Sequence, residues 1–233
     1  MNLAEKYQLP RRDFFKITAG ALGIWISADR VSSSIAQTKE ETWPKKISKE
    51  VQRLLKEMEA QSSRYWSVPK KDGQFLNFFI RAMKAKQVLE VGTSQGYSAI
   101  WMGLALKETG GHLTTIEIGK SRYELAKKYV NQAGLSTHIT LINGDAHQEI
   151  IKLRGPFDFV FLDADKEGQV DYFQKLYPHK ILPGGVIAVH NAIQYAKSMQ
   201  DYLDLVRHHP NFDSIIVSAT LEDGFSLSYR LPT

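Results

Sequence analysis

The fold is decided by one stretch of the sequence, Val88-Leu89-Glu90-Val91-Gly92-Thr93-Ser94-Gln95-Gly96-Tyr97-Ser98. It predicts a buried strand that ends in an acid and a glycine, followed by a tight turn and the start of a helix. A strand, turn and helix in this order place backbone N–H groups and a helix N-terminus around a ligand at the carboxyl edge of a sheet. Gly92 and Gly96 are four residues apart, so the stretch is not the G-x-G-x-x-G dinucleotide fingerprint.

Strand and helix patterns alternate along the rest of the chain. Strands are predicted at 87–92, 112–118, 138–143, 157–163, 186–190, 213–218 and 225–231. Helices are predicted at 47–58, 74–84, 96–108, 120–133, 169–179 and 196–209, and a short helix after Gly144-Asp145-Ala146-His147 is predicted to end at about residue 153. A turn is predicted over 67–73, before the second of these helices. Continuous apolar strands that alternate with helices predict an α/β fold with a parallel sheet covered on both faces. The last two strands follow one another around Asp223-Gly224, as in an antiparallel hairpin.

Composition excludes several classes of protein. The chain of 233 residues allows one full-sized domain with an appendage. Its net charge of +5 includes no Lys/Arg cluster, so composition gives no case for nucleic-acid binding. The absence of cysteine excludes disulfides, thiolate metal sites and a cysteine nucleophile.

The first 36 residues carry the parts of an export signal. A basic segment, Arg11-Arg12-Asp13-Phe14-Phe15-Lys16, precedes a weakly apolar run over 17–28, and Ser34-Ile35-Ala36 offers small residues for cleavage. The paired arginines followed by Phe-Phe-Lys resemble the twin-arginine type of signal. The apolar run has about twelve residues, fewer than the roughly 20 that span a bilayer. The alternative is an N-terminal amphipathic helix with two incidental arginines.

These patterns predict three parts of the chain: a twin-arginine signal at 1–36, a polar linker at 37–46 and a folded domain at 47–233. The twin-arginine export machinery would then be a partner, and the protein would be periplasmic or membrane-associated. The lack of cysteine fits an oxidising compartment.

Polar residues stand where the predicted strands end, at the edge of the sheet that binds ligands in such folds. Glu117 ends the second strand, where an acid is positioned to accept both hydroxyls of a ribose. Asp163 and His190-Asn191 end later strands, and Asp145 follows the third, where a helix N-cap is an equal alternative. The glycine turn and Glu117 together predict a nucleoside-containing cofactor. The absence of both G-x-G-x-x-G and GK[ST] argues against NAD(P) and a P-loop triphosphate.

Seven blocks carry a family resemblance, in order and at matching spacing: V-P-x-x-x-G-Q-F-L (68–76), V-L-E-V-G-T-S-Q-G-Y-S (88–98), T-I-E-I (115–118), G-D-A (144–146), F-D-F-V-F-L-D-A-D-K (157–166), G-G-V-I-A-V-H-N (184–191) and D-G-F-S-L-S (223–228). With them, the chain from about Ile47 to Arg230 resembles the class I S-adenosylmethionine-dependent O-methyltransferases. More narrowly, it resembles the small cation-dependent group that includes catechol and caffeoyl-CoA O-methyltransferases. The resemblance implies a Rossmann-like, seven-stranded sheet that is mostly parallel, with only the last strand antiparallel.

The resemblance also implies a binding role for each matching position. The amino-acid end of S-adenosylmethionine would be lined by Val68, Glu90, Gly92, Thr93 and Ser98, with Gly96 closing the same turn. Glu117 would hold the ribose, Ala146 and its neighbour Asp145 the adenine, and Asp165 the methionine moiety.

The catalytic roles implied by the resemblance fall on two of the strand ends. Asp163 and Asn191 match two ligands of the family's divalent cation, and His190 completes the predicted set. Lys166 matches the lysine proposed there as general base, with a solvated lysine at a helix start as the alternative. Methyl transfer from a sulfonium needs an oxygen nucleophile held in line and partly deprotonated. A cation coordinated by vicinal hydroxyls lowers their pKa, and a lysine nearby then accepts the proton.

One position departs from the family pattern, because His190-Asn191 stands where the family usually has Asp-Asn. A neutral imidazole lowers the ligand charge from −2 to −1, which weakens binding of Mg²⁺ or Ca²⁺ more than that of Mn²⁺, Fe²⁺, Co²⁺ or Zn²⁺. Three interpretations stay open: a shifted metal preference, a lost metal with His190 as the base, or a structural histidine in an inactive protein.

The sequence thus predicts an exported O-methyltransferase that acts on a small hydroxylated, catechol-like aromatic. Because S-adenosylmethionine is made in the cytosol, the enzyme would act before export or remain anchored by an uncleaved signal. The alternative function is an exported, non-catalytic binding protein with the same fold. Hydroxylated tRNA bases are substrates of some relatives, but the export signal and the lack of a basic patch argue against them here. Relatives are often dimers, so a homodimer is left open.

Overall fold

The computed structural model describes residues 43–219 and 223–232. The predicted signal at 1–36 and most of the predicted linker lie outside these residues. Among the residues described, no helix combines the length and the apolar character needed to cross a membrane. The fold is formed by the unit that begins at Lys45.

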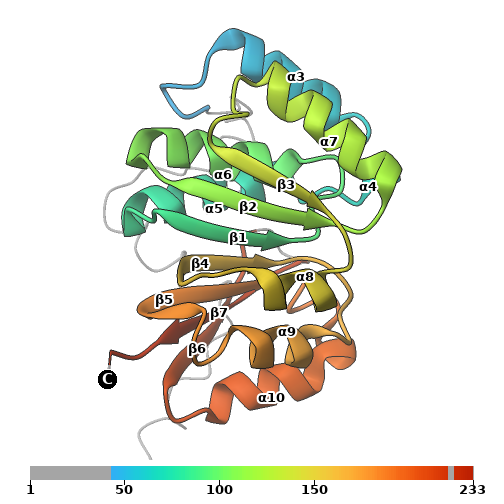
Figure 1. Ribbon diagram of the computed structural model, residues 1–233. Helices are drawn as coiled ribbons and strands as arrows, with labels where there is room; N and C mark the ends of the chain where they lie inside the picture. Colours follow the sequence, from blue (N-terminus) through green and yellow to red (C-terminus); the bar gives the residue numbers. More distant parts are fainter. Residues whose placement is uncertain (1–42, 220–222, 233) are drawn as a thin grey trace, which may run out of the picture. The chain divides into compact units, whose positions relative to one another are not determined.

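A seven-stranded sheet in the order β3-β2-β1-β4-β5-β7-β6 forms the centre of this unit (Figure 1). β1 to β5 pair in parallel, and only β7 runs antiparallel to its two neighbours, β5 and β6. This confirms the predicted fold class and the predicted hairpin. The strands are β1 (Gln87–Val91), β2 (His112–Glu117), β3 (Ile139–Asn143), β4 (Phe157–Leu162), β5 (Ile181–His190), β6 (Phe212–Val217) and β7 (Phe225–Arg230).

Helices cover both faces of the sheet, as continuous apolar strands require. The described helices are α3 (Lys49–Glu59), α4 (Ser62–Tyr65), α5 (Lys70–Met83), α6 (Tyr97–Thr109), α7 (Lys120–Gln132), α8 (Ala146–Lys152), α9 (Gln169–Leu176), the 3-10 helix η2 (Ala196–Met199) and α10 (Gln200–His208). Alternate residues of β1 face opposite layers. Leu89 and Val91 belong to the core shared with α8, α9 and α10, whereas Glu90 accepts a hydrogen bond from Ser98 of α6.

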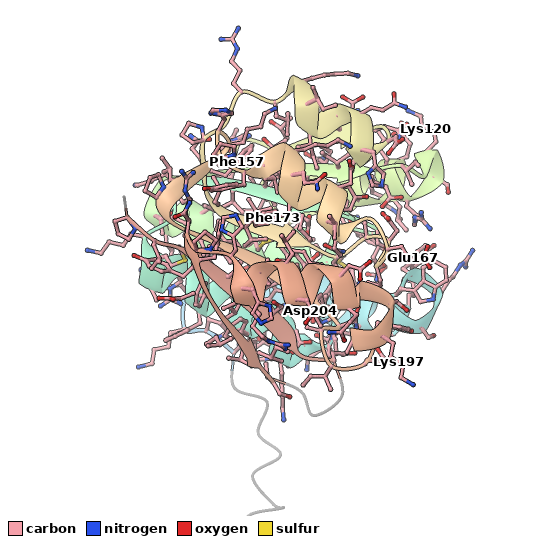
Figure 2. The ribbon with its side chains drawn as sticks, turned by 90° about the horizontal axis from the view of Figure 1, so that it is seen from below. Lys120, Phe157, Glu167, Phe173, Lys197 and Asp204 are labelled. Atoms are coloured by element: carbon pink, nitrogen blue, oxygen red, sulfur yellow. The ribbon has the colours of Figure 1, made fainter. Side chains whose placement is uncertain are left out.

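An aromatic cluster fixes the layer of α9 and α10 against the edge of the sheet. Phe173 of α9, labelled in Figure 2, belongs to this cluster. The centroid of its ring lies 6.4 Å from that of Tyr202 of α10 and 5.2 Å from that of Phe212 of β6. Edge-to-face and tilted contacts of this kind add to the free energy gained by burial alone. The cluster thus packs α9 and α10 against β6, the last strand of the sheet.

The turn predicted over 67–73 is wrong from Lys70 onward, because α5 begins there. Pro69 is the N-cap residue of this helix, and Asp72 lies in its first turn. The prediction took Gly73 as a turn residue. In the structure, a Cβ on Gly73 would meet the indole of Trp101 at 2.3 Å, so this glycine allows α5 to approach α6 closely.

The second difference concerns β5, which begins at Ile181 and contains the predicted turn Pro183-Gly184-Gly185. The register between β4 and β5 shifts across this point: Phe157 pairs with Ile181, whereas Phe159 pairs with Val186. Proline and glycine are tolerated in a strand where an irregularity of this kind interrupts the ladder. The strand recovers its regular pairing before it reaches the site.

Candidate active site

A cavity of about 920 Å³ lies at the carboxyl ends of β1, β2, β4 and β5. This is the edge of the sheet at which the sequence predicted ligand groups. The cavity is lined by twelve of the residues predicted from the sequence: Val68, Gly92, Thr93, Ser98, Glu117, Asp145, Ala146, Asp163, Asp165, Lys166, His190 and Asn191. The fold therefore brings the predicted cofactor, catalytic and metal residues into one site.

The turn after β1 brings the backbones of β1 and β4 into contact. Gly92 has a φ of 97°, and a Cβ on it would lie 2.3 Å from the carbonyl oxygen of Asp163. Only glycine fits this conformation and this approach. Gly96, with a φ of 88°, is the N-cap residue of α6 and faces Ala126 of α7. It shapes the turn but is not part of the cavity wall.

Glu117 at the end of β2 holds the same turn from the other side. One carboxylate oxygen accepts the backbone N–H of Ser94 at 2.8 Å, and the other accepts Gly119 N–H at 2.7 Å and Arg122 Nε at 2.8 Å. Each carboxylate oxygen has two lone pairs, so with three donors already bound Glu117 keeps room for one further donor, on the oxygen that accepts from Ser94. Its position in the cavity wall suits an acceptor of a ribose hydroxyl.

Glu90 lies behind the cavity wall and is completely buried. Its two oxygens accept the hydroxyls of Ser98 and Thr115, each at 2.5 Å. Burial raises the pKa of Glu90 to about 7, although both hydrogen bonds oppose the shift. Of this group, Ser98 reaches the cavity, so Glu90 acts on a ligand there through Ser98 and through its charge.

The segment at the start of α8 lines a second part of the cavity. Asp145 is the N-cap residue of α8 and accepts the backbone N–H of His147 at 2.9 Å, which is the alternative weighed for it above. The ring of His147 stacks on Tyr172 at 4.4 Å, and the Tyr172 hydroxyl donates to Asp165 at 2.5 Å. Asp165 is therefore held in place from α9, with His147 Nε2 3.5 Å from its Oδ2.

Asp163 and Lys166 form an ion pair at the end of β4, with Lys166 Nζ 2.9 Å from Asp163 Oδ1. Both side chains are mostly buried, at 16% exposure for the lysine and 14% for the acid. Burial tends to raise the pKa of Asp163, but the charges of Lys166 and His190 outweigh it and lower the pKa to about 2. Lys166 is thus held in the cavity and is not a solvated lysine.

His190, the last residue of β5, lies between two carboxylates. Its Nε2 is 2.7 Å from Asp72 Oδ2 on α5, and its Nδ1 is 3.4 Å from Asp163 Oδ1. Both His190 and Asp72 are buried. Burial tends to lower the pKa of His190, but the two carboxylates outweigh it and raise the pKa to about 9. With no other cation bound, the ring is therefore an imidazolium at neutral pH.

Asn191 and Asp223 complete this end of the cavity. Asn191 has a φ of 61° and donates its amide Nδ2 to Asp223 Oδ1 at 3.0 Å. Because a carboxylate only accepts, the amide keeps its carbonyl oxygen for another partner. Asp72, His190 and Asp223 each offer one ligand atom within 4.8 Å of the others. Carboxylate, imidazole and amide oxygen together form a donor set that fits a divalent cation.

The chain matches the family model described as O-methyltransferase over residues 43–220. This protein belongs to the O-methyltransferase family. A catechol O-methyltransferase from Niastella koreensis is 35% identical over 139 residues, which cover 58% of this chain and 62% of that protein. A caffeoyl-CoA O-methyltransferase from Populus kitakamiensis is 35% identical over 161 residues, which cover 63% and 68%.

The chain thus spans just under two thirds of the first of these relatives. A solved cofactor-bound structure, of Rv0187 from MTB, matches this O-methyltransferase family member over 90% of its chain and 100% of that chain. The two are 26% identical, with a TM-score of 0.71. The two proteins therefore share the same overall fold.

Sequence reasoning missed four residues of this O-methyltransferase site: Asp72, His147, Tyr172 and Asp223. Asp72 was read as part of a turn, although it stands inside the first block of the resemblance. Asp223 opens the last block, and its proximity to Asn191 depends on the pairing of β5 with β7. His147 directly follows the G-D-A block, which was the available signal for it.

Proposed function

We propose that this protein transfers the methyl group of S-adenosylmethionine to a hydroxyl oxygen of a small, catechol-like aromatic, assisted by a divalent cation. The observation that carries the proposal is the Asp163–Lys166 pair, 2.9 Å apart in the same cavity as Glu117 and the glycine turn. A lysine and a carboxylate, the groups proposed as base and cation ligand, thus lie beside the predicted cofactor site. Similarity to a catechol and a caffeoyl-CoA O-methyltransferase supports the same reaction class.

The residues around the turn and at the end of β4 suit the two positively charged groups of the cofactor, its sulfonium and its ammonium. Glu117 offers an acceptor to the ribose, and the carboxylates of Asp163 and Asp165 face the cavity. A sulfonium and an ammonium both favour a site lined by acids. Ser98, bonded to Glu90 at 2.5 Å, extends this negative environment toward the amino-acid end.

In the reaction, the S–CH₃ bond of the cofactor breaks as an O–CH₃ bond forms. The products are S-adenosylhomocysteine and an aryl methyl ether. Lys166 Nζ, 2.9 Å from Asp163 Oδ1, is the group that we propose receives the hydroxyl proton. A divalent cation held by Asp163, His190 and Asn191 would supply the charge that acidifies the hydroxyls. The buried surroundings orient the oxygen for in-line attack.

The test is the product. The full chain, incubated with S-adenosylmethionine and a panel of catechols and of matched mono-phenols, is expected to yield a mass increase of one methyl group on the catechols. Calorimetry with S-adenosylhomocysteine checks cofactor binding separately. Cofactor binding without any methylated product would support a binding protein and overturn the proposal.

We also propose that residues 1–36 direct export through the twin-arginine route. The support is the arrangement of the arginine pair, the apolar run and the small residues at 34–36. Replacing Arg11 and Arg12 together by lysine is expected to leave the protein in the cytosolic fraction, while the unaltered chain reaches the periplasm or the membrane. An unchanged distribution between fractions would refute this part.

A further inference from the structure

We propose that Asp72 is a positioning residue that aims Nδ1 of His190 into the cavity, and that the pair makes the cation site select nitrogen-binding transition ions over Mg²⁺. The proposal rests on the cation site of the proposed function. It assigns a role to a buried acid on α5, an element that carries no predicted ligand of the site.

The first step is the direction of the imidazole ring. Nε2 of His190 lies 2.7 Å from Asp72 Oδ2, a normal hydrogen-bond distance. A carboxylate only accepts, so Nε2 carries the proton. Nδ1 lies 3.4 Å from Asp163 Oδ1, which is longer than the usual N–H···O bond. Two atoms bound to one ion at about 2.0–2.2 Å are at most about 4.4 Å apart, so this spacing allows both to be ligands.

The second step is the confinement of the ring. Phe225 of β7 lies 5.1 Å from the His190 ring, and Phe161 of β4 lies 6.1 Å from it in an edge contact. The His190 side chain is only 4% exposed, and that of Asp72 is fully buried. A ring packed in this way does not rotate freely, so its two nitrogens do not exchange positions. The hydrogen bond that Nε2 of His190 donates to Asp72 therefore decides which nitrogen faces Asp163.

The third step is the chemistry of the ligand. Imidazole suits Zn²⁺, Co²⁺ and Mn²⁺ better than it suits Mg²⁺, which prefers oxygen ligands. A carboxylate bonded to the far nitrogen fixes the tautomer of a metal-binding histidine and raises its basicity. Removing such a partner typically lowers metal affinity by about 10–100-fold. The pair of Asp72 and His190 has this arrangement.

The charges around the ring agree with a bound cation. Asp72 faces it from α5, Asp163 from the end of β4, and Asp223 from the segment before β7. Lys166 Nζ lies 2.9 Å from Asp163 Oδ1 and brings a positive charge to the same carboxylate. Asp72 itself is engaged with Nε2, so the ligands left for the ion are Asp163, Nδ1 of His190 and the amide oxygen of Asn191.

The test measures ion binding and needs no turnover. Chelator-treated full-length protein is titrated with Co²⁺, Zn²⁺, Mn²⁺ and Mg²⁺ separately by calorimetry, and bound Mn²⁺ is examined by electron spin echo spectroscopy for a coordinated imidazole nitrogen. The expected results are tighter binding of Co²⁺ and Zn²⁺ than of Mg²⁺, and a nitrogen signal. The spectroscopic result requires no variant and so does not depend on a variant that folds.

Three variants separate positioning from general stability. Asp72→Asn is expected to weaken Co²⁺ binding by about 10–100-fold with a much smaller change for Mg²⁺. His190→Asp should remove the nitrogen signal and shift the preference toward Mg²⁺. Asp171→Asn is the matched control, because Asp171 is bonded to another histidine, His147, at 2.5 Å and is expected to leave ion binding unchanged.

The outcomes distinguish this inference from the proposed function. Binding of Mg²⁺ as tight as that of Co²⁺, or a bound ion without a nitrogen signal, would overturn the role of Asp72 and leave the methyl-transfer proposal standing. Methylated product from a protein that binds none of the four ions would overturn both this inference and the cation part of the proposed function.

Discussion

The α-carbon of Gly92 packs against the backbone of Asp163, so that a Cβ at Gly92 would lie 2.3 Å from the Asp163 carbonyl oxygen. The turn predicted to hold the cofactor and the acid predicted to act in catalysis are therefore joined by a direct backbone contact. The β1–β4 ladder continues this contact, since the N–H of Asp163 donates to the carbonyl of Val91 at 2.8 Å. Any side chain at position 92 must therefore displace either the turn or the backbone of Asp163.

Gly92→Ala is expected to destabilise the fold and to reduce methyl transfer together. The positive φ of 97° costs about 1–2 kcal/mol for a residue with a Cβ, and the clash with Asp163 adds about 1–3 kcal/mol. Gly134→Ala is the control, because Gly134 has a φ of 65° with open space around its Cβ. Urea unfolding measures the free energy of unfolding of both variants. Equal losses of unfolding free energy in the two variants would contradict the steric account.

Lys166→Gln is expected to lower kcat by roughly 10²–10⁴-fold, because it removes the proton acceptor. The dissociation constant of S-adenosylhomocysteine should stay nearly unchanged, since the variant keeps the turn and Glu117. Lys152→Gln is the matched control: Lys152 pairs with Glu149 at the same spacing in sequence, 2.7 Å apart, on the outside of α8. Full turnover by Lys166→Gln would remove this lysine from the mechanism.

Glu90 is expected to make the protein less stable as the pH rises. Its pKa is raised from 4.5 to about 7, chiefly by burial, with smaller contributions from the charges of Asp163 and Glu117. Below pH 4.5 the acid is protonated in both folded and unfolded chains. Between about pH 4.5 and 7 the unfolded chain ionises first, so stability is lost up to an order of 3 kcal/mol.

Glu90→Gln, which resembles the protonated acid, isolates this effect. The difference in unfolding free energy between the unaltered protein and the variant is expected to change over this pH interval and to level off above about pH 7 to 8. Other titrating groups contribute equally to both proteins and cancel. A difference that is constant from pH 4 to 8 would show that folding does not raise the pKa of Glu90.

Removal of divalent ions is expected to lower methyl transfer by roughly a hundredfold or more, because charge stabilisation by an ion contributes several kcal/mol. Activity should return with Mn²⁺, Co²⁺ or Zn²⁺ more readily than with Mg²⁺. Asp163→Ala should lose both the activity and the response to added ions. Turnover that is unchanged in the presence of a chelator would exclude a role for an ion in this reaction.

The fold and most of the site were predictable because the signals are local. Each strand that ends in a polar residue is followed by its own turn and helix, so Glu117, Asp163 and Asn191 could be placed from short windows of sequence. The strand–turn–helix at Gly92 is likewise defined by eleven consecutive residues, 88–98. The sheet then brings these strand ends together without further information.

The remaining parts depend on contacts between distant segments. Asp72 and His190 are 118 residues apart, and only the packing of α5 against the sheet brings them within 2.7 Å. Gly73 was read as a turn residue because glycine signals turns locally, whereas here it fits against Trp101. The sequence alone shows that His190 replaces the family's usual aspartate, but it does not show that Asp72 is the hydrogen-bond partner of this histidine.

The contact between Gly92 and Asp163 restricts mutation at the cofactor turn, whereas the residues at the rim of the cavity are free of this restriction. This backbone approach ties the position of the glycine turn to that of Asp163, so neither main-chain segment shifts without the other. The rim has no such restriction: Trp66 is 79% exposed and Tyr195 46% exposed, and both border the cavity. Descendants of this sequence can therefore exchange one acceptor molecule for another by mutation at the rim while inheriting the methyl-donor geometry intact.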